Sequence, residues 1–244
     1  AMETTNYIAL SRQAALRREL NLVANNMANL NTPAYQGESM MFVEYLADTQ
    51  RGKTGEMSFV QDLSTVRDLK EGPMTRTENP LDLAISGRGY FTIETEEGPR
   101  YTRNGAFQLN QEGQIVNKAN QPLLDDNGNP IDVPADAQAI EIGEDGTIAT
   151  EFGPIARLEP VAFENEQLLN KRANGLFEAR EEQVAEPAED ARVLQGMIEG
   201  SNVQGVVEMT RLIDLSRSYS SANKFTESEH ERILRAVRSL VSSQ

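Results

Sequence analysis

Proline is confined almost entirely to the middle of this chain, where nine of its ten prolines lie between Pro73 and Pro187. Because proline lacks a backbone N–H and clashes with the preceding helical turn, it interrupts α-helices. The two ends are therefore free to form long helices, whereas the middle is not. Charge follows the same division: residues 1–35 and 203–244 each sum to +1, so the acidic excess behind the net charge of −15 lies between them.

The N-terminal segment carries one apolar stripe. Its apolar residues recur at steps of four and three, which places them on one face of an α-helix. These residues are Leu16, Leu20, Val23, Met27 and Leu30. The run Asn31-Thr32-Pro33 then ends the helix, since proline restricts the residue before it. The pattern predicts a helix over about residues 4–30.

The C-terminal segment carries two adjacent helical rows of apolar residues. The first row is Val206, Met209, Ile213, Leu234, Val237 and Val241, and the second is Leu212, Leu215, Tyr219, Ala222, Ile233, Ala236 and Leu240. A helix of about 38 residues is roughly 57 Å long, more than a compact domain of this size covers. Part of it must therefore meet the N-terminal helix or another chain. Polar residues interrupt the stripe, as at Asn223 and 226–231, and such positions set register.

The middle has the rhythm of β-strands, with short apolar or alternating runs between turn dipeptides. The strand candidates are 81–85, 90–93, 106–109, 140–142 and 147–150. The turns are expected at Asn104-Gly105, Glu112-Gly113, Asn127-Gly128 and Asp145-Gly146, where glycine or asparagine tolerates positive φ. No alternation of strands and helices is visible, so an antiparallel sandwich or barrel-like sheet is favoured.

The expected fold class is α+β, with terminal helices and a central antiparallel β-rich domain. Five segments follow from these patterns: an N-terminal helix (1–35), an extended connector (36–72), the β-rich domain (73–187), a return connector (188–202) and a C-terminal helix (203–244). No apolar run has the roughly 18 residues that a membrane span needs, and no cleaved secretory signal is visible. We therefore expect no membrane insertion.

Composition argues against most catalytic and cofactor chemistry. The chain has no cysteine and one histidine, His230, which lies among glutamates in the predicted C-terminal helix, so we expect no metal, cofactor or catalytic site. The acidic balance argues against nucleic acid, whose phosphates attract clustered lysine and arginine. The carboxylate pairs of the middle, such as Glu96 with Glu97, are expected to be solvated surface.

Two loops resemble ligand sites but fit turns better. Residues 125–130 (DDNGNP) begin like a calcium loop, yet Pro130 stands where an EF-hand has glycine, and Asp136 stands where it has glutamate. We therefore expect a β-turn there. Gly87-Arg88-Gly89 is followed by a strand rather than by the helix that a phosphate loop opens, so it too is expected to be a tight turn.

Asparagines crowd the end of the first helix at Asn25, Asn26, Asn29 and Asn31. One interpretation is local capping, because asparagine bonds its own backbone near helix ends. The other is that Asn25 and Asn29, four residues apart on one face, bond a neighbouring helix and set its register. The residues alone leave both interpretations open.

Three blocks of the sequence resemble one family in order. Residues 23–35 (VANNMANLNTPAY) resemble the ANN-[LI]-AN-x-NT signature that begins bacterial flagellar rod and hook proteins. Residues 79–85 (NPLDLAI), 87–91 (GRGYF) and 101–107 (YTRNGAF) resemble the central pattern of that family. The C-terminal block of residues 200–203 (GSNV), with Val207-Glu208-Met209, Ile213 and Arg217-Ser218-Tyr219, also agrees with it.

This resemblance implies a structural subunit of the flagellar basal-body rod, a drive shaft that transmits torque. It also implies export through the flagellar type III apparatus without a cleaved signal, a place in the periplasmic rod, and rod subunits as partners. In the family the two terminal helices form a coiled-coil inner domain. The subunit-interface residues expected here are Leu16, Leu20, Val23, Asn25, Asn26, Met27, Asn29, Leu30, Met209, Ile213, Tyr219, Leu234, Val237 and Leu240.

Within the family, the opening residues 6–13 and the run 40–44 (MMFVE) are most similar to proximal rod proteins of the F type. A distal rod or hook subunit is the alternative, and a secreted β module that binds a ligand such as calcium or glycan is a more distant one. Pro33-Ala34 departs from the Thr-Gly of many members, so a stiffer turn is expected after the first helix.

Overall fold

The computed structural model describes residues 2–45 and 60–241, with side chains described at 10–41, 64–235 and 238. The chain divides into two compact units. The helical unit contains α1 (Met2–Ala28), α2 (Gly205–Val241) and a two-stranded ribbon of β1 (Glu38–Tyr45) and β2 (Val60–Arg67), of which Arg67 is counted with the second unit. The β unit contains Asn29–Gly37 and Arg67–Val203. This is an α+β fold, as predicted.

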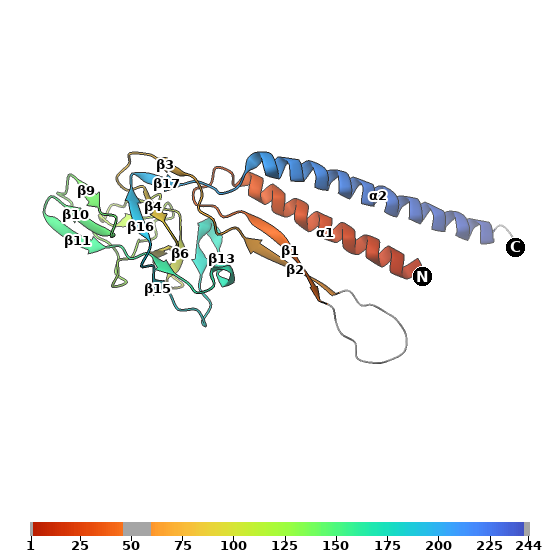
Figure 1. Cartoon of the computed structure of the whole chain (residues 1–244), viewed down its shortest axis with the longest axis horizontal. Helices are drawn as coiled ribbons and strands as arrows, with labels where there is room; N and C mark the ends of the chain where they lie inside the picture. Colours follow the sequence, from red (N-terminus) through yellow and green to blue (C-terminus); the bar gives the residue numbers. More distant parts are fainter. Residues whose placement is uncertain (1, 46–59, 242–244) are drawn as a thin grey trace. The chain divides into compact units, whose positions relative to one another are not determined.

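Helices α1 and α2 lie side by side and run antiparallel (Figure 1). Their bounds lie close to those that apolar periodicity predicted. After α1 the backbone N–H of Thr32 donates to the Asn29 carbonyl at 3.2 Å, and Ala34 takes a φ of 55°. A non-glycine residue in this left-handed region is strained. The stiffer turn expected at Pro33-Ala34 stays a prediction.

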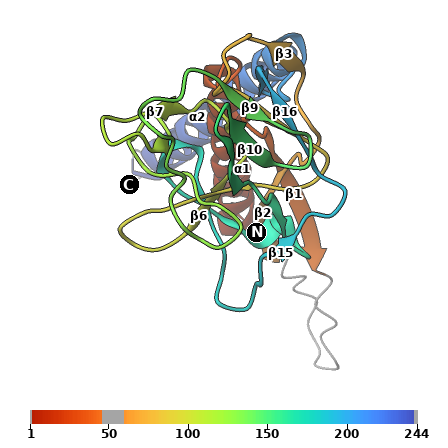
Figure 2. The same ribbon diagram turned by 90° about the vertical axis from the view of Figure 1, so that its left-hand side faces the viewer.

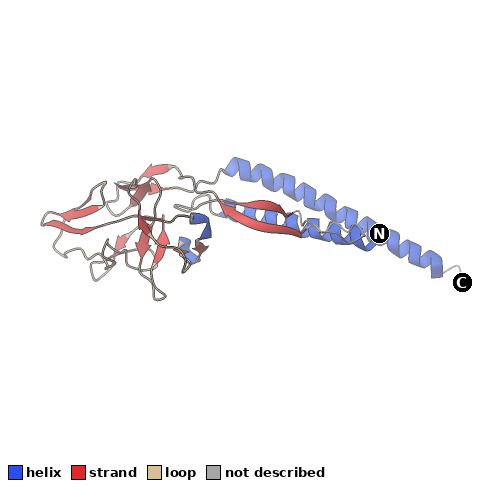
Figure 3. Ribbon diagram, turned by 60° about the horizontal axis from the view of Figure 1, so that its bottom comes forward, coloured by secondary structure: helices blue, strands red, loops and turns tan. Residues whose placement is uncertain are grey.

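The ribbon of β1 and β2 falls within residues 36–72, which were expected to form an extended connector. Figure 3 shows its two strands beside α1 within the helical unit. Inside the helical unit, the side-chain amide of Asn26 holds the start of the ribbon by bonding both backbone groups of Glu38. The extended backbone is thus a paired element of the fold.

The β unit consists of short antiparallel strands grouped in small sheets. Its strands are β3 (Met74–Arg76), β4 (Leu83–Ser86), β5 (Phe91–Ile93), β6 (Arg100–Thr102), β7 (Gln108–Leu109), β8 (Ile115–Val116), β9 (Ile140–Ile142), β10 (Thr147–Thr150), β11 (Gly153–Arg157), β12 (Val161–Ala162), β13 (Asn170–Lys171), β14 (Phe177–Glu178), β15 (Glu186–Pro187), β16 (Arg192–Gln195) and β17 (Met197–Glu199).

The largest sheet has four strands in the order β13-β14-β6-β5, and the next has three in the order β11-β10-β9. The remaining strands of this unit form the pairs β12-β15, β16-β4, β17-β3 and β7-β8. Figure 2 shows these small sheets from the end of the β unit. The strand rhythm favoured an antiparallel sandwich or barrel-like sheet, whereas the described strands of this unit form small antiparallel sheets of two to four strands.

Two apolar clusters make the core of the β unit. The larger one is built from aliphatic residues and contains Leu83, Ile115, Leu123, Ile131 and Ile148, all essentially inaccessible to solvent. The smaller one is mostly aromatic, with Tyr90, Tyr101, Phe163 and Phe177 in edge or tilted ring contacts. Burial of this apolar area is the main force that holds the short strands together.

A ring of three backbone hydrogen bonds closes the centre of the larger cluster. Leu123 donates to Ile115, Ile131 donates to Leu123, and Ile115 donates to Ile131, at 2.9–3.1 Å. The turns that lead into these three residues start at Asn110, Asn117 and Asp125. In each, the side-chain oxygen accepts two backbone N–H bonds of its own turn. The residue three positions on has positive φ in all three turns.

The glycine predictions are mostly confirmed. Gly113, Gly128 and Gly146 have positive φ as expected, and Gly87 and Gly89 form the predicted tight turn between β4 and β5. Glycine is required at position 105 for a different reason. Its φ is ordinary, but a Cβ there would lie 1.7 Å from the Leu83 carbonyl oxygen, so glycine is needed for close approach of the chain rather than for a left-handed turn.

Candidate functional site

The facing surfaces of α1 and α2 use one apolar stripe from each helix. On α1, Val23 is fully buried and Leu16, Leu20 and Met27 are half-buried. On α2 the half-buried residues are those of the second predicted row, namely Leu212, Leu215, Tyr219 and Ala222. The helix pair therefore covers one of the two α2 rows from within the chain.

Polar contacts fix the register of this helix pair. The Asn26 amide, which also bonds the backbone of Glu38 at 2.8 and 3.0 Å, donates to the buried Glu208 carboxylate at 3.1 Å. Arg211 reaches from α2 to Glu19 of α1 at 3.3 Å. Farther along the pair, the amide of Gln13 donates to Asn223. These polar groups pair across the helices, so sliding one helix along the other would leave buried groups unsatisfied.

The first predicted row of α2 is exposed at the four positions whose side chains are described. Val206, Met209, Ile213 and Leu234 are 82%, 54%, 47% and 42% exposed. Because large apolar side chains in a row seldom stay in water without a partner, this row is a candidate interaction surface. We call these four residues the free stripe.

The predicted interface residues thus fall into several groups. Leu16, Leu20, Val23, Met27 and Tyr219 face the partner helix of the same chain, while Met209, Ile213 and Leu234 belong to the free stripe. Asn26 is buried within the helical unit, and the side chain of Asn25 is exposed.

Four interface residues need separate mention. The Asn29 side chain accepts a bond from the Thr32 hydroxyl at 3.0 Å, and Leu30 is half-buried in the same turn. The side chains of Val237 and Leu240 lie outside the described residues.

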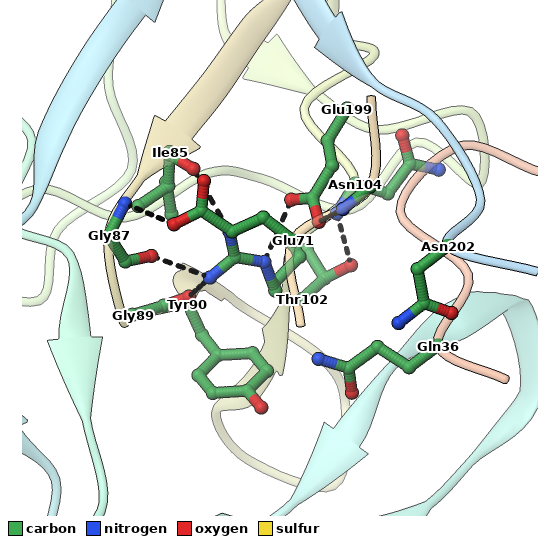
Figure 4. Close-up of polar contacts among 12 residues, drawn as sticks. Gln36, Glu71, Ile85, Gly87, Gly89, Tyr90, Thr102, Asn104, Glu199 and Asn202 are labelled. Atoms are coloured by element: carbon green, nitrogen blue, oxygen red, sulfur yellow. Dashed lines mark hydrogen bonds and ion pairs between the residues drawn. The ribbon is translucent and has the colours of Figure 1, made fainter. Parts of the chain in front are cut away.

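The β unit contains a buried ion pair that sequence reasoning missed. Arg103 donates to Glu199 at 2.8 Å, and both side chains are almost fully buried. The same guanidinium donates to the carbonyls of Ile85, Gly87 and Gly89 at 2.9–3.0 Å, as Figure 4 shows. The other Glu199 carboxylate oxygen accepts a bond from the Gly72 backbone at 3.0 Å.

This pair makes Arg103 a structural residue. Its donors are used to hold the turn between β4 and β5 and the last strand, β17, in one place. In the sequence, Arg103 stands within the block YTRNGAF, between residues that are buried in the structure. This position suggests that Arg103 is buried, but it does not identify Glu199 as its partner.

A second polar group surrounds Glu166. Its carboxylate accepts from Arg88 at 2.8 Å and from the hydroxyl of Tyr90 at 2.9 Å, and Arg67 donates to its backbone carbonyl. Arg67 also lies over the Phe177 ring, 4.4 Å from the ring centroid. Burial raises the pKa of Tyr90 from 10.0 to about 12, and the Glu166 charge adds to this shift. Tyr90 is thus a neutral hydrogen-bond donor at ordinary pH.

In the loop 125–130, which resembled a calcium site, the first acidic side chain bonds the backbone of its own turn. The Asp125 carboxylate accepts the N–H groups of Asn127 and Asn129 at 2.9 and 2.8 Å, as expected of a turn.

His230 is exposed on α2. Among the side chains described, no group of three or more histidine, cysteine or acidic residues is placed to hold a metal ion. No helix in residues 2–45 and 60–241 is long and apolar enough to cross a membrane.

A hollow of about 450 Å³ lies in the β unit. Its lining includes Thr102, Asn104 and Asn117, whose side-chain oxygens accept bonds from backbone N–H groups of their own turns. Lys118 is the one ionisable side chain among its described lining residues. The hollow therefore lacks the paired acid and base that general acid–base chemistry uses.

A helix pair with an uncovered apolar stripe, joined to a β unit whose buried charges serve its own structure, defines a structural subunit made for assembly. Three family models match the chain. The flagella basal body rod protein model covers residues 7–36, the flagellar hook protein FlgE/F/G D1 domain covers 84–150, and the flagellar basal body rod FlgEFG protein C-terminal model covers 194–238.

Full-length relatives agree with these models. The flagellar basal-body rod protein FlgF of Caulobacter vibrioides is 36% identical over 98% of both chains, and that of Rhizobium meliloti is 33% identical over all of both. The rod protein FlgG of Bacillus subtilis is 28% identical over 92% of this chain and 94% of its own length. This chain belongs to the flagellar basal-body rod protein family, in its F group.

Proposed function

We propose that this chain is a structural subunit of the proximal flagellar rod that assembles through its terminal helices and acts mechanically, without catalysis. The observation that carries the proposal is the free stripe on α2. Full burial of an exposed side chain of this kind gains about 1.5–3 kcal/mol, and the three half-exposed members of the stripe gain about half of that. Such a stripe on a long helix fits the apolar face of another helix.

The neighbours proposed for the free stripe are helices of other rod subunits, of this chain or of related rod proteins. Together these helices would form the coiled-coil inner domain expected of the family. The near-neutral ends favour close packing, while the acidic middle repels its copies and stays outward. In this arrangement residues 1–35 and 203–244 form the inner domain and 73–187 the outer one. The expected connector 36–72 contains the β1–β2 ribbon of the helical unit, and the expected connector 188–202 contains strands β16 and β17 of the β unit.

The proposal also includes the route and the place of assembly. A rod subunit must pass the inner membrane before it assembles, and the proposed route is the flagellar type III export apparatus, with the periplasmic rod as destination. The F-group relatives from Caulobacter and Rhizobium are 36% and 33% identical, against 28% for the FlgG protein of Bacillus subtilis, which favours a proximal rod subunit over a distal rod or hook subunit. No observation favours a ligand-binding β module.

Substitutions at two neighbouring residues of α2 test assembly and folding separately. Ile213→Asp changes the free stripe, whereas Leu212→Asp changes the row that faces α1. We expect Ile213→Asp to keep the helix content of the monomer, measured by circular dichroism, and to abolish swimming and incorporation into purified basal bodies. Leu212→Asp should reduce helix content as well, and Leu16→Asp should behave like it, because both place a charge in the intramolecular seam.

Ser218→Asp is the matched control, because Ser218 is an exposed polar residue on the same helix. It should swim normally. If Ile213→Asp swims normally and is recovered from basal bodies at the wild-type level, assembly through the free stripe is wrong.

A further inference from the structure

The chain passes between its two units four times, and three of these crossings lie beside Gly37, Arg67 and Val203 of the β unit. Backbone hydrogen bonds join the segments that contain them. Ala34 donates to Glu199 at 2.8 Å, Asn202 donates to Tyr35 at 3.1 Å, and Asp68 donates to Gly37 at 2.7 Å. Segments far apart in sequence therefore leave the β unit from adjoining positions.

The side chain of Asn202 bonds both of the other segments. Its Oδ1 accepts the Gly37 backbone N–H at 2.7 Å, and its Nδ2 donates to the carbonyls of Asp68 and Lys70 at 2.8 and 2.9 Å. An acceptor and two donors on one short side chain are the property of an amide. Aspartate offers no donor when ionised, and alanine offers neither group.

Close packing beside Asn202 leaves little room for these segments to shift. A Cβ at Gly72 would lie 2.0 Å from the Gly200 carbonyl oxygen, and Gly200 donates to the Pro73 carbonyl at 2.8 Å. The buried Glu199 carboxylate holds the Gly72 N–H at 3.0 Å while it pairs with Arg103. The segment that carries Asn202 is thus anchored to the core of the β unit.

We propose that Asn202 is a positioning residue that clamps three chain crossings at one place on the β unit, so that mechanical load enters this unit through a fixed point. The clamp itself follows from the hydrogen bonds. Its role under load rests on the proposed rod function. Removing the amide breaks its bonds to Gly37, Asp68 and Lys70. The backbone bonds of Ala34 and Asn202 remain, and neither apolar cluster is touched.

Hydrogen exchange of the full chain, followed by mass spectrometry, tests the clamp. In Asn202→Ala we expect the amides of Gly37 and Asp68 to exchange at least about tenfold faster, while those of Ile115, Leu123 and Ile131 stay at the wild-type rate. Asn202→Asp should have a larger effect at pH 7, because its carboxylate faces two carbonyl oxygens. The excess over Asn202→Ala should shrink as the carboxyl group takes up its proton near pH 4.

The matched control is Asn117→Ala, which removes an asparagine side chain whose oxygen accepts two backbone N–H bonds of its own turn. Its effect should be confined to its own turn. Unchanged exchange at Gly37 and Asp68 in Asn202→Ala, or an equal rise across the whole β unit, overturns the clamp. If the clamp loosens yet cells swim at wild-type speed in viscous medium, load transfer through Asn202 is wrong. The free-stripe variants test the rod function separately.

Discussion

At the scale of single residues, the β unit is organised by buried polar groups that have found partners. Arg103 and Glu199 neutralise each other, and the remaining donors of Arg103 are bonded to backbone carbonyls. Removing one partner of such a pair typically costs about 3–5 kcal/mol, because the other charge stays buried. Apolar burial supplies the main stabilisation of the unit, and the buried polar pairs fix which segments meet.

Ionisation of Tyr90 makes the free energy of unfolding depend on pH, and the direction of its pKa shift sets the sign of this dependence. Its pKa is about 12 in the folded chain against an ordinary value of 10.0, so the folded state keeps a proton that the unfolded state releases. Stability is full below pH 10 and falls as pH rises toward 12. By pH 11 this group should remove about 1.4 kcal/mol from the free energy of unfolding. Urea unfolding at pH 9 and 11 measures it.

Tyr90→Phe is the control for that measurement. It removes the titrating group and the bond to Glu166, so its stability should fall less between pH 9 and 11 than that of the wild type. Equal losses in both proteins would show that the tyrosine in the aromatic cluster is not the source.

At the scale of elements, the three turns that begin at Asn110, Asn117 and Asp125 share a positive φ at their fourth residue. Gly113 and Gly128 have φ of 83° and 79°, but a Cβ at Gly113 would lie 2.8 Å from the Val133 carbonyl oxygen, whereas nothing lies within 4 Å at Gly128. Gly128→Ala should therefore cost about 1 kcal/mol from backbone strain alone. Gly113→Ala should cost clearly more, as chemical denaturation would measure. Equal costs would contradict this account.

Sequence patterns predicted these elements unevenly. The helices were found within a few residues, because apolar periodicity and proline are local signals. The turn at Asn117–Gln121 was not predicted, because Asn120 supplies its positive φ outside any X-Gly turn dipeptide. The three-bond ring at Ile115, Leu123 and Ile131 was also missed, since it depends on three turns bending alike.

At the scale of the whole molecule, the two units differ in how completely their apolar side chains are buried. The β unit has two apolar clusters, whereas the helical unit exposes the free stripe of α2. Helices that lack partners fray in dilute solution. We expect two calorimetric transitions in the monomer, with the helical unit melting first, and early protease cleavage in α1 and α2.

A matched pair of variants assigns the transitions. Leu83→Ala, at a fully buried position of the β unit, should lower the upper transition, with a loss of about 2–5 kcal/mol. Leu212→Ala should lower the lower one. One joint transition, or protease-resistant helices in dilute monomer, would contradict this division of stability.

The sequence by itself determined the helical ends, the β-rich middle and the family, because periodicity, proline and motif order are properties of neighbouring residues. Only the tertiary structure decided which α2 row faces α1 and which remains free, since both rows are equally apolar in sequence. It alone also paired Arg103 with Glu199 and Asn202 with Gly37, Asp68 and Lys70. Such pairs join residues about 100 or more positions apart. The chemistry of each residue shows that it requires a hydrogen-bonding or charged partner, but it does not identify that partner.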